Sequence, residues 1–297
     1  MRGVHLRFAS AATIVWIACA GLATFPQPAP AESLSDVAYV ESPHAEQHLD
    51  FDWPGGTPPA TVLFIHGGSL QESGERRRSP AYRDVCRPFL TAGFACATTD
   101  YRLAPSFTWP AMPHDVAAAV ARVRSLVTAR GGDPDRLFLF GHSSGCTLAS
   151  SLGTNPSYLA TVELSPRNLA GVVAMGCVLD NNDLALRGVT ADRIREPFQR
   201  DPDEVRTFGT PEGFLSAIPS FFVDANSAPT LVVVAEAERV HPPILEQGAH
   251  FVRLLDEAGV HGELVIVPGK HMSSIEAIGR PGDPTFAAIR RFLERKP

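Results

Sequence analysis

The sequence predicts an α/β fold in which a mostly parallel, eight-stranded sheet is flanked by helices and carries a small cap insertion. Three observations lead to this prediction. Short runs of aliphatic and β-branched residues recur at wide spacing along the chain. These runs are continuous rather than alternating, which is typical of strands covered on both faces. Helical patterns lie between them, and an alternation of strand and helix favours parallel strands joined by helical crossovers.

Six continuous apolar runs are expected to form the central strands. They span residues 61–65, 94–99, 137–140, 171–175, 231–234 and 263–267. Two runs nearer the N-terminus, residues 37–41 and 47–51, are expected to add an antiparallel edge. The sheet is therefore predicted to contain eight strands.

Three segments have the period of a helix. Residues 115–130, 244–258 and 284–294 place apolar side chains at three- and four-residue steps, which gives each helix one apolar face. The first two end at Gly131 and Gly259, because glycine suits the left-handed conformation at a helix end. These helices are expected to cover the sheet.

One interval, residues 181–227, breaks the alternation of strands and helices. It is rich in charge and proline, contains scattered aromatic residues, and is too long for an ordinary connection. We expect a small cap over one end of the sheet. Its aromatic side chains either line an acyl pocket or form the core of the cap itself, and the pattern is compatible with both.

Residues 1–31 have the pattern of a secretory signal peptide. Two arginines precede an uncharged run at residues 8–25, and small residues before Glu32 suit cleavage there. The mature domain, residues 32–297, would then be secreted or periplasmic. Since the uncharged run borders on the length that spans a bilayer, an uncleaved anchor is the alternative. Apart from this segment, we expect no stable membrane partner.

Composition and charge exclude other classes of protein. Hydrophobic residues make up 44% and charged residues 20% of the chain, so a buried core is expected rather than disorder. The net charge of -6 and the lack of a long basic tract argue against nucleic acid as a partner. The four cysteines after the signal segment allow up to two disulfides or buried free thiols. No C-x-x-C pair supports a zinc or redox site, and we expect no cofactor or metal.

The motif Gly-His-Ser-Ser-Gly at residues 141–145 directly follows a predicted strand and precedes an apolar run that favours a helix. A sharp turn from strand to helix holds the central residue, Ser143, in a strained conformation with its hydroxyl exposed. Neighbouring side chains would collide with such a turn, which explains the glycines at both ends of the motif. His142 occupies its variable position. The pattern predicts that Ser143 is a nucleophile.

A serine hydroxyl becomes nucleophilic when a base takes its proton, and the base needs an orienting carboxylate. His271 follows the last predicted strand, so it is expected at the same edge of the sheet as Ser143 and is the candidate base. Glu236 and Glu238 both lie in the loop after the preceding strand. The chain order of serine, acid and histidine matches the nucleophile-elbow arrangement with either glutamate.

Acyl transfer also needs hydrogen-bond donors for the oxyanion of the tetrahedral intermediate. The segment His-Gly-Gly-Ser at 66–69 follows the first central strand, and its glycines let backbone N–H groups approach a ligand closely. Ser144 begins the helix after the nucleophile, where the helix dipole favours an anion. We expect donors from this loop and from the Ser144 N–H group. His66 is expected to orient the glycine loop.

Four ordered motifs resemble the signatures of the hormone-sensitive-lipase-like carboxylesterases, a family with the α/β-hydrolase fold. They are His-Gly-Gly at 66–68, Tyr-Arg-Leu-Ala-Pro at 101–105, Gly-Gly-Asp-Pro-Asp-Arg at 131–136 and the serine motif at 141–145. The resemblance covers residues 60–295 and implies ester hydrolysis. The implied site residues are Ser143 as nucleophile, His271 as base, and Gly68, Ser69 and Ser144 as oxyanion donors.

The chain departs from the family pattern at two positions. Ser69 replaces the third glycine of the loop, which keeps the backbone N–H but changes the shape of the pocket. The family acid is usually an aspartate in a Gly-x-x-Asp turn, and the matching segment here places Glu238 at that position. Glutamate is an accepted acid in such triads. The resemblance therefore implies Glu238, with Glu236 as its rival.

The expected function is that of a secreted serine carboxylesterase that cleaves small-molecule esters of short or medium acyl chains through an acyl-enzyme. An amidase or aryl-formamidase of the same fold would use the same residues and is the first alternative. An inactive hydrolase-fold binding protein is the second, although Ser143 and His271 are both retained. The arginines at 76–78 are expected to form a solvated loop rather than an anion site.

Overall fold

The computed structural model describes residues 31–180, 189–238 and 244–295. The expected signal segment, residues 1–31, lies outside these residues except for Ala31. Residues 181–188 of the expected cap also lie outside them. The remaining predictions fall on described residues.

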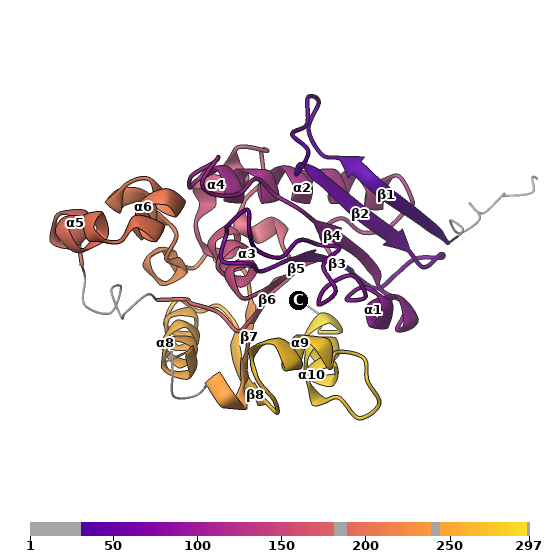
Figure 1. Cartoon of the computed structure of the whole chain (residues 1–297). Coiled ribbons are helices and arrows are strands. Elements are labelled where there is room, and N and C mark those ends of the chain that lie inside the picture. Colours follow the sequence, from indigo (N-terminus) through magenta and orange to yellow (C-terminus); the bar gives the residue numbers. More distant parts are fainter. Residues whose placement is uncertain (1–30, 181–188, 239–243, 296–297) are drawn as a thin grey trace, which may run out of the picture.

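The eight strands form one sheet with the order β1-β2-β4-β3-β5-β6-β7-β8, as Figure 1 shows. The strands are β1 (Glu32–Ala38), β2 (His48–Trp53), β3 (Thr61–Ile65), β4 (Ala95–Thr99), β5 (Leu137–His142), β6 (Gly171–Met175), β7 (Thr230–Ala235) and β8 (Gly262–Val267). β2 runs antiparallel to both β1 and β4, and the other neighbouring pairs are parallel. The expected mostly parallel, eight-stranded α/β architecture is confirmed.

The central strands are covered on both faces, which explains their continuous apolar runs. In β3, Leu63 and Ile65 belong to one hydrophobic core, whereas Val62 and Phe64 belong to another. All four side chains are buried. Because successive side chains of a strand point to opposite faces, the two cores lie on the two sides of the sheet.

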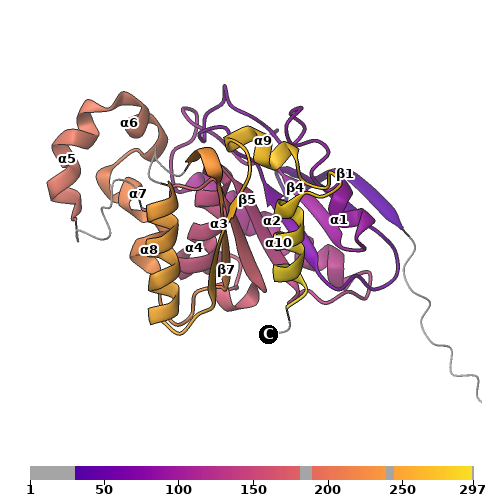
Figure 2. The same cartoon turned by 90° about the horizontal axis from the view of Figure 1, so that it is seen from below.

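Helices cover both faces of the sheet. They are α1 (Arg87–Thr91), α2 (Ala111–Thr128), α3 (Ser144–Thr154), α4 (Pro156–Ala160), α8 (Ile244–Glu257), α9 (His271–Glu276) and α10 (Pro284–Leu293), with a 3-10 turn η1 (Pro166–Asn168) before β6. Apolar residues of α2, α3 and α8 join the first core, and those of α1, α9 and α10 join the second. Figure 2 shows α8 and α10 on opposite sides of β7. None of the helices described is both long and apolar enough to cross a membrane.

Several boundaries differ from those expected. The edge strand expected at residues 37–41 is β1, which lies earlier, at Glu32–Ala38, where it pairs with β2. β5 continues to His142, two residues beyond the predicted end, because it pairs with β6 as far as Met175. α2 begins at Ala111, before the predicted start, and contains Pro113 in its first turn. An N–H group has no partner within the helix there, so the proline breaks no hydrogen bond.

The described part of the expected cap contains three short helices and a 3-10 turn. They are α5 (Ala191–Arg200), α6 (Pro202–Phe208), α7 (Pro211–Ser216) and η3 (Pro219–Phe222). Ile194, Phe198, Phe214 and Ile218 form a small core among them. Figure 1 shows α5 and α6 beyond the end of the sheet, on the side away from β1.

The four cysteines that the structure describes pair as two disulfides, Cys86–Cys96 and Cys146–Cys177. The sequence left open whether they were bridged or free. The first bridge ties the start of α1 to β4, and the second ties α3 to the chain just after β6. The paired Cα atoms are 5.5 Å and 5.4 Å apart, within the usual range for disulfides.

Candidate active site

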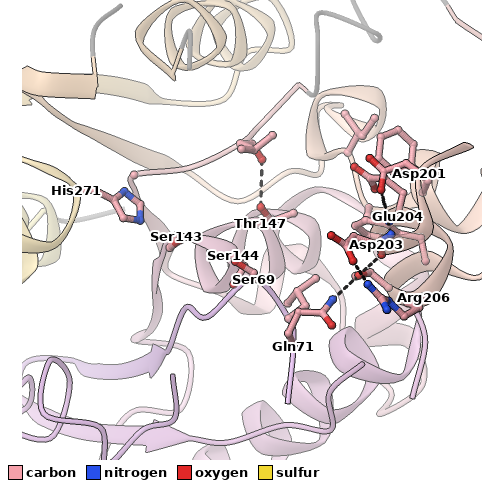
Figure 3. Close-up of a pocket in the computed structure, with 18 of the residues that line it drawn as sticks. Ser69, Gln71, Ser143, Ser144, Thr147, Asp201, Asp203, Glu204, Arg206 and His271 are labelled. Atoms are coloured by element: carbon pink, nitrogen blue, oxygen red, sulfur yellow. Dashed lines mark hydrogen bonds and ion pairs between the residues drawn. The ribbon is translucent and has the colours of Figure 1, made fainter. Parts of the chain in front are cut away.

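The carboxyl ends of parallel strands bring the expected site residues to one edge of the sheet. Ser143 follows β5, Glu238 ends the 3-10 turn η4 (Glu236–Glu238) after β7, and His271 begins α9 after β8. All three line one cavity of about 1080 Å³, shown in Figure 3. Ligand sites in parallel sheets typically lie at this edge.

The turn around Ser143 is strained and closely packed. Ser143 has φ 56° and ψ -129°, a left-handed conformation that a residue with a side chain rarely adopts. A Cβ at Gly141 would lie 2.3 Å from the carbonyl oxygen of Gly145, and one at Gly145 would lie 2.2 Å from the carbonyl oxygen of Ile65. Only glycine fits at either position, as the serine motif predicted.

The ring of His271 is held by a carboxylate. Its Nδ1 hydrogen-bonds Oε1 of Glu238, whose Oε2 accepts the backbone N–H of Ala235 at 3.0 Å. Glu238 is buried, whereas Glu236 is exposed and does not line the cavity. Of the two candidate acids, the structure brings Glu238 to the histidine.

The pKa of Glu238 determines which ring nitrogen of His271 carries the proton. Burial would raise the pKa of Glu238, but hydrogen bonds from His271 and Ala235 outweigh it, so the pKa lies below its usual value. The carboxyl is therefore ionised at neutral pH and accepts the Nδ1 proton of His271. In the neutral ring this leaves Nε2 with a free lone pair, which is what a general base requires.

A glycine packs against the same pair. Gly176, directly after β6, has φ 62°. A Cβ at this position would lie 3.0 Å from Nδ1 of His271 and 3.2 Å from Oε1 of Glu238. The positive φ at position 176 favours glycine, and a side chain there would have to displace His271 and Glu238 by a few tenths of an ångström.

The loop after β3 lies against the nucleophile. A Cβ at Gly67 would lie 2.8 Å from the Cβ of Ser143, so the glycine allows this approach. Ser69, with φ 58°, and Ser144, the first residue of α3, line the same cavity as Ser143. The backbone of these two residues is thus close to the space where an oxyanion would form.

Gly68, the third expected donor, is placed differently. It does not line the cavity, and a Cβ there would lie 2.4 Å from the backbone nitrogen of Glu75. Its positive φ of 113° is favourable for glycine alone. Gly68 therefore forms the turn that leads to Ser69, packed against the next part of the loop.

His66 is fully buried beneath this loop. Its ring stacks on Tyr101 with centroids 4.4 Å apart, and its Nδ1 donates to the carbonyl oxygen of Gly67 at 2.7 Å. Nε2 lies 3.3 Å from Oδ1 of Asp100. Burial lowers the pKa of His66 to about 4, so the ring is neutral at physiological pH. The stacking and the hydrogen bond to Gly67 fit the expected role of orienting the glycine loop, whereas Nε2 has no hydrogen-bond partner among the residues that the structure describes.

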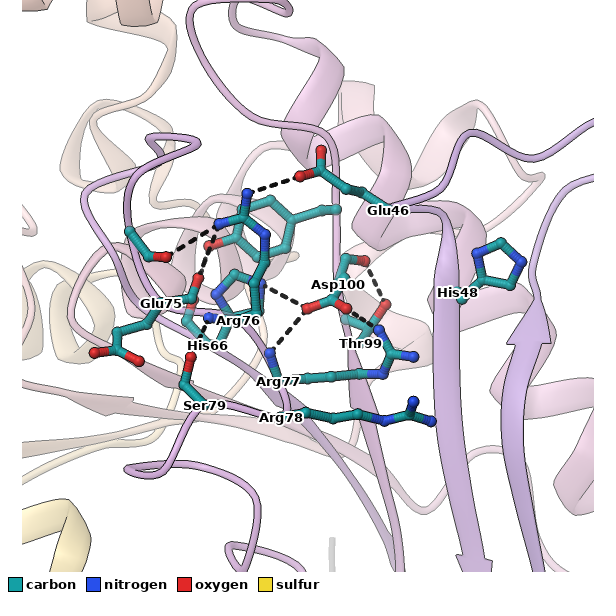
Figure 4. A network of polar contacts seen from close by, with 12 residues as sticks. Glu46, His48, His66, Glu75, Arg76, Arg77, Arg78, Ser79, Thr99 and Asp100 are labelled. Atoms are coloured by element: carbon teal, nitrogen blue, oxygen red, sulfur yellow. Dashed lines mark hydrogen bonds and ion pairs between the residues drawn. The ribbon is translucent and has the colours of Figure 1, made fainter.

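Of the arginines at 76–78, expected as a solvated loop, Arg78 is exposed but Arg77 is buried. Arg77 is only 5% exposed and pairs with Asp36, Asp50 and Asp100. Figure 4 shows Arg77 and Asp100 close to His66. A buried charge needs partners, and the carboxylates that partner Arg77 are distant in sequence. A local charge pattern therefore gave no sign of this burial.

The cap forms the far wall of the cavity, which we call the cap wall. Residues 201, 203, 204, 206, 207 and 208 of α6 and its N-cap line it, and Phe214 of α7 adds an apolar surface. Gln71 joins the glycine-loop side to the cap, since its Nε2 donates to Oγ1 of Thr207 at 2.6 Å. Phe214 also belongs to the core of the cap, so one aromatic side chain serves both of the roles that the sequence left open.

Glu204 of the cap wall is an unusual carboxyl group. Burial raises its pKa to about 7, and repulsion from Asp201 and Asp203 adds to the rise. Its Oε2 is buried without a hydrogen-bond partner. Figure 3 shows Glu204 across the cavity from Ser143 and His271.

Several cavity residues were not anticipated from the sequence, among them Gln71, Thr147 and Glu204. They come from a loop, a helix and the cap, and no local motif marks them. The charge and proline content of the cap segment was the one visible signal. Within the residues described, no group of three or more His, Cys, Asp or Glu side chains is arranged to hold a metal ion.

The fold and the cavity define the class of protein. A strained serine between β5 and α3, with a histidine–carboxylate pair after the last strands, is characteristic of the α/β-hydrolases. The chain belongs to the BD-FAE family, whose family model matches residues 51–252. The resemblance to hormone-sensitive-lipase-like esterases that the sequence motifs indicated is confirmed by relatives that include Esterase LipC and the probable carboxylic ester hydrolase LipM of Mycobacterium tuberculosis.

Curated relatives are named as esterases. Esterase LipC of Mycobacterium tuberculosis is 32% identical over 249 residues, which cover 80% of this chain and 59% of the relative. Ethyl acetate hydrolase of Pseudomonas putida is 26% identical over 218 residues, which cover 71% and 64%. The chain thus spans about three fifths of the length of these two relatives.

A solved structure shares the fold. Esterase B from Lactobacillus rhamnosis superposes with a TM-score of 0.67 at 19% identity, covering 90% of this chain and 87% of that one. At this identity the likeness supports the α/β-hydrolase fold alone.

Proposed function

We propose that the protein is a serine hydrolase that cleaves carboxylic esters of short or medium acyl chains through an acyl-enzyme intermediate. One observation carries the proposal: a strained Ser143 shares a cavity with His271, which Glu238 holds by a hydrogen bond. The names of the curated relatives, an esterase and an ethyl acetate hydrolase, support this reaction class.

In the proposed reaction, Nε2 of His271 takes the proton of Ser143 while Oγ attacks the carbonyl carbon of the ester. The electron pair of the C=O bond moves to oxygen and then returns as the C–O bond to the alcohol breaks. The alcohol leaves with the proton from His271. Water, deprotonated by the same ring, then attacks the acyl carbon. The bond from that carbon to Oγ breaks, and Oγ takes the proton back from His271, which releases the carboxylic acid and restores Ser143. Glu238 stabilises the imidazolium that forms in each half.

Backbone N–H groups of Ser69 and Ser144 bind the oxyanion in this proposal. Losing one such donor typically lowers the rate by roughly 10²- to 10³-fold. The start of α3 adds the favourable end of a helix dipole at Ser144. Gly68 supplies the turn that presents Ser69, since its own backbone packs against Glu75.

The cavity has room for a small ester. Its volume of about 1080 Å³ lies just above the range of roughly 300–1,000 Å³ that is typical of small-molecule sites. Phe214, Ala217 and Ile218 give it an apolar wall. Each buried methylene of an acyl chain would add about 0.8 kcal/mol, so a chain of a few carbons gains useful binding energy there.

The experiment that tests the proposal is turnover of p-nitrophenyl esters of graded acyl length, alongside an aryl-formamide. We expect the ester of highest kcat/KM to have a short or medium chain, and labelling of Ser143 by a fluorophosphonate probe. Negligible ester cleavage with formamide turnover would instead indicate an amidase. A folded protein whose Ser143 does not react with the probe would indicate a binding protein.

We also propose that the protein is exported and is secreted or periplasmic. Two disulfides support this, because such bridges persist in oxidising compartments. The signal-like pattern of residues 1–31 supports it independently. The test is to express the full chain and sequence the N-terminus of the protein outside the cytoplasm. We expect Glu32 as the first residue, and an intact Met1 in the membrane fraction would favour the uncleaved anchor.

A further inference from the structure

His142, the variable residue of the serine motif, lies directly against the candidate base. Its side chain is fully buried, and its ring is tilted by 36° to the ring of His271 with centroids 4.7 Å apart. Nε2 of His142 lies 3.0 Å from the carbonyl oxygen of His271. On its other side, Nδ1 lies 2.8 Å from the hydroxyl of Tyr82. Both ring nitrogens therefore have a partner.

The chemistry of these partners assigns the protons. The carbonyl oxygen of His271 can only accept a hydrogen bond, so Nε2 of His142 must carry a proton and donate it. Burial, and to a smaller extent repulsion by His271, lower the pKa of His142 to about 4. The ring is therefore neutral at physiological pH. Its Nδ1 then holds a lone pair and accepts from Tyr82, which must be the donor.

Tyr82 is well suited to remain the donor. Burial raises its pKa to about 12, so the hydroxyl keeps its proton across the working range of pH. The same hydroxyl lies against the glycine loop, because a Cβ at Gly67 would be 2.9 Å from the Tyr82 oxygen. Tyr82 thus contacts both His142 and the loop that carries Ser69. The chain of contacts runs from the glycine loop through Tyr82 and His142 to the backbone of His271.

We propose that Tyr82 and His142 form a positioning relay that fixes the backbone of the catalytic histidine relative to the glycine loop and Ser143. The inference rests on the proposed function and adds to it a role for two residues that do not touch the substrate. His271 begins a short helix after a three-residue loop, and its side chain is 40% exposed. The carbonyl oxygen of His271 accepts a hydrogen bond from Ser274 within its own helix at 3.0 Å, and His142 is the group that ties the same oxygen to β5.

A neutral His142 is also compatible with protonation of His271 during the reaction. When His271 takes the proton of Ser143 it becomes an imidazolium, and a second positive ring in contact with it would oppose this step. A polarised neutral ring can stack on the cation without that cost. The hydroxyl of Tyr82 secures the neutral tautomer by donating to Nδ1, so that the proton remains on Nε2.

Three variants of His142 separate the two hydrogen bonds. The amide nitrogen of His142→Gln can take the place of Nε2, whereas that of His142→Asn lies near the place of Nδ1. His142→Phe keeps the ring but has neither nitrogen. We expect kcat to fall about tenfold in the Phe and Asn variants and by less than about threefold in the Gln variant, with KM within about twofold of wild type.

A matched control uses another buried, hydrogen-bonded side chain. Tyr158 donates its hydroxyl proton to the carbonyl of Ser216 at 2.8 Å and does not line the cavity. Tyr158→Phe should lower thermal stability with kcat unchanged, whereas Tyr82→Phe should lower kcat by a few fold. Wild-type kcat in a folded His142→Phe variant would overturn the proposal. So would a Gln variant that is as impaired as the Phe variant at equal stability.

A second readout does not depend on turnover. Imidazole ¹⁵N NMR of the wild-type protein should show His142 protonated at Nε2 and unprotonated at Nδ1 over pH 5 to 8. A proton on Nδ1 would overturn the relay even if the protein is an active esterase. If Ser143 neither hydrolyses esters nor reacts with a fluorophosphonate, the proposed function fails instead. The two failures therefore give different results.

Discussion

The floor of the cavity and the cap wall are built in different ways. The floor consists of the turns after β3, β5, β7 and β8, and its polar groups are held by specific buried contacts. Glu238, for example, accepts hydrogen bonds from both His271 and Ala235. The cap wall consists of short helices with a small core, and Asp201, Asp203 and Arg206 on it are exposed.

The floor and the cap wall therefore serve different purposes: the floor positions the reacting groups, and the cap wall contacts the rest of the substrate. Groups that must meet within a fraction of an ångström lie where a parallel sheet fixes the backbone on both sides. Groups that contact only the remote part of a substrate lie on an insertion that can change without disturbing the sheet. Changes in the floor should therefore lower kcat, whereas changes in the cap wall should alter KM and its dependence on pH.

The largest expected effect is that of Ser143→Ala. Removing the nucleophile of a serine hydrolase typically lowers kcat by roughly 10⁴- to 10⁶-fold. Thermal unfolding should be little changed, because the turn accommodates a smaller side chain. Ser144→Ala is the matched control, since it keeps the backbone N–H and should retain activity within about threefold. An unfolded Ser143→Ala protein would contradict this account of the turn.

The next effect separates the two glutamates. Glu238→Gln should lower kcat by about 10³- to 10⁴-fold, because a neutral amide cannot stabilise the imidazolium and favours the wrong tautomer of His271. Glu236→Gln, at an exposed position, should remain within about twofold of wild type. Steady-state kinetics on one ester decides between them. The opposite order would transfer the role of the acid to Glu236.

Glu238 should also affect how the free energy of unfolding depends on pH. The pKa of Glu238 is lower in the folded protein than its usual value, so its stabilising contribution is present above that value and is lost as pH falls through the folded pKa. Glu238→Gln should therefore lose less stability than wild type on going from pH 6 to pH 3. Urea unfolding of both proteins at several pH values gives the free energy of unfolding. An equal loss in wild type and Glu238→Gln between pH 6 and pH 3 would contradict the prediction.

A smaller loss is expected in the glycine loop. Gly67→Ala places a Cβ within 2.8 Å of Ser143 and should displace the loop, with a fall in kcat of roughly 10²-fold. Ser69→Gly is the contrasting variant, because it keeps the N–H group and relieves a positive φ of 58°. We expect it to retain activity within about threefold. A Gly67→Ala protein with wild-type kcat would show that the loop can move freely.

The smallest effect should come from the cap wall. The pKa of Glu204 is raised to about 7, so its carboxyl is neutral at pH 6 and charged at pH 8. KM for an apolar ester should therefore rise about threefold across this range, beyond any change in kcat, and Glu204→Gln should abolish the rise. Glu212→Gln, exposed on α7, is the control. A rise that persists in the Gln variant would exclude Glu204 as its cause.

Much of the fold could be predicted from the sequence because its signals are local. Apolar runs located seven of the eight strands to within two residues and overlapped only the end of β1. Helix periodicity located three helices, two of which end near a glycine. The serine motif predicted the turn at Ser143 for the same reason. The collisions that require Gly141 and Gly145 arise within that turn and with the end of the neighbouring strand β3. The expected family and fold are confirmed by comparison.

What the sequence could not predict depends on contacts between distant segments. Arg77 looked like a solvated residue because its carboxylate partners come from β1, β2 and the end of β4. His142 was interpreted only as the variable residue of its motif, because its partners Tyr82 and His271 lie 60 and 129 residues away in the sequence. The pairing of the cysteines was likewise hidden. Periodicity and spacing carry no information about which distant side chains meet.

Gly176 shows what such hidden contacts mean for the tolerance of the chain to mutation. It lacks a side chain and contributes no reacting atom, yet any replacement would push into the histidine–glutamate pair. In a library of all single substitutions selected for activity, we therefore expect most replacements at this position to be depleted. Such a screen would detect a sensitive residue that carries no reactive group.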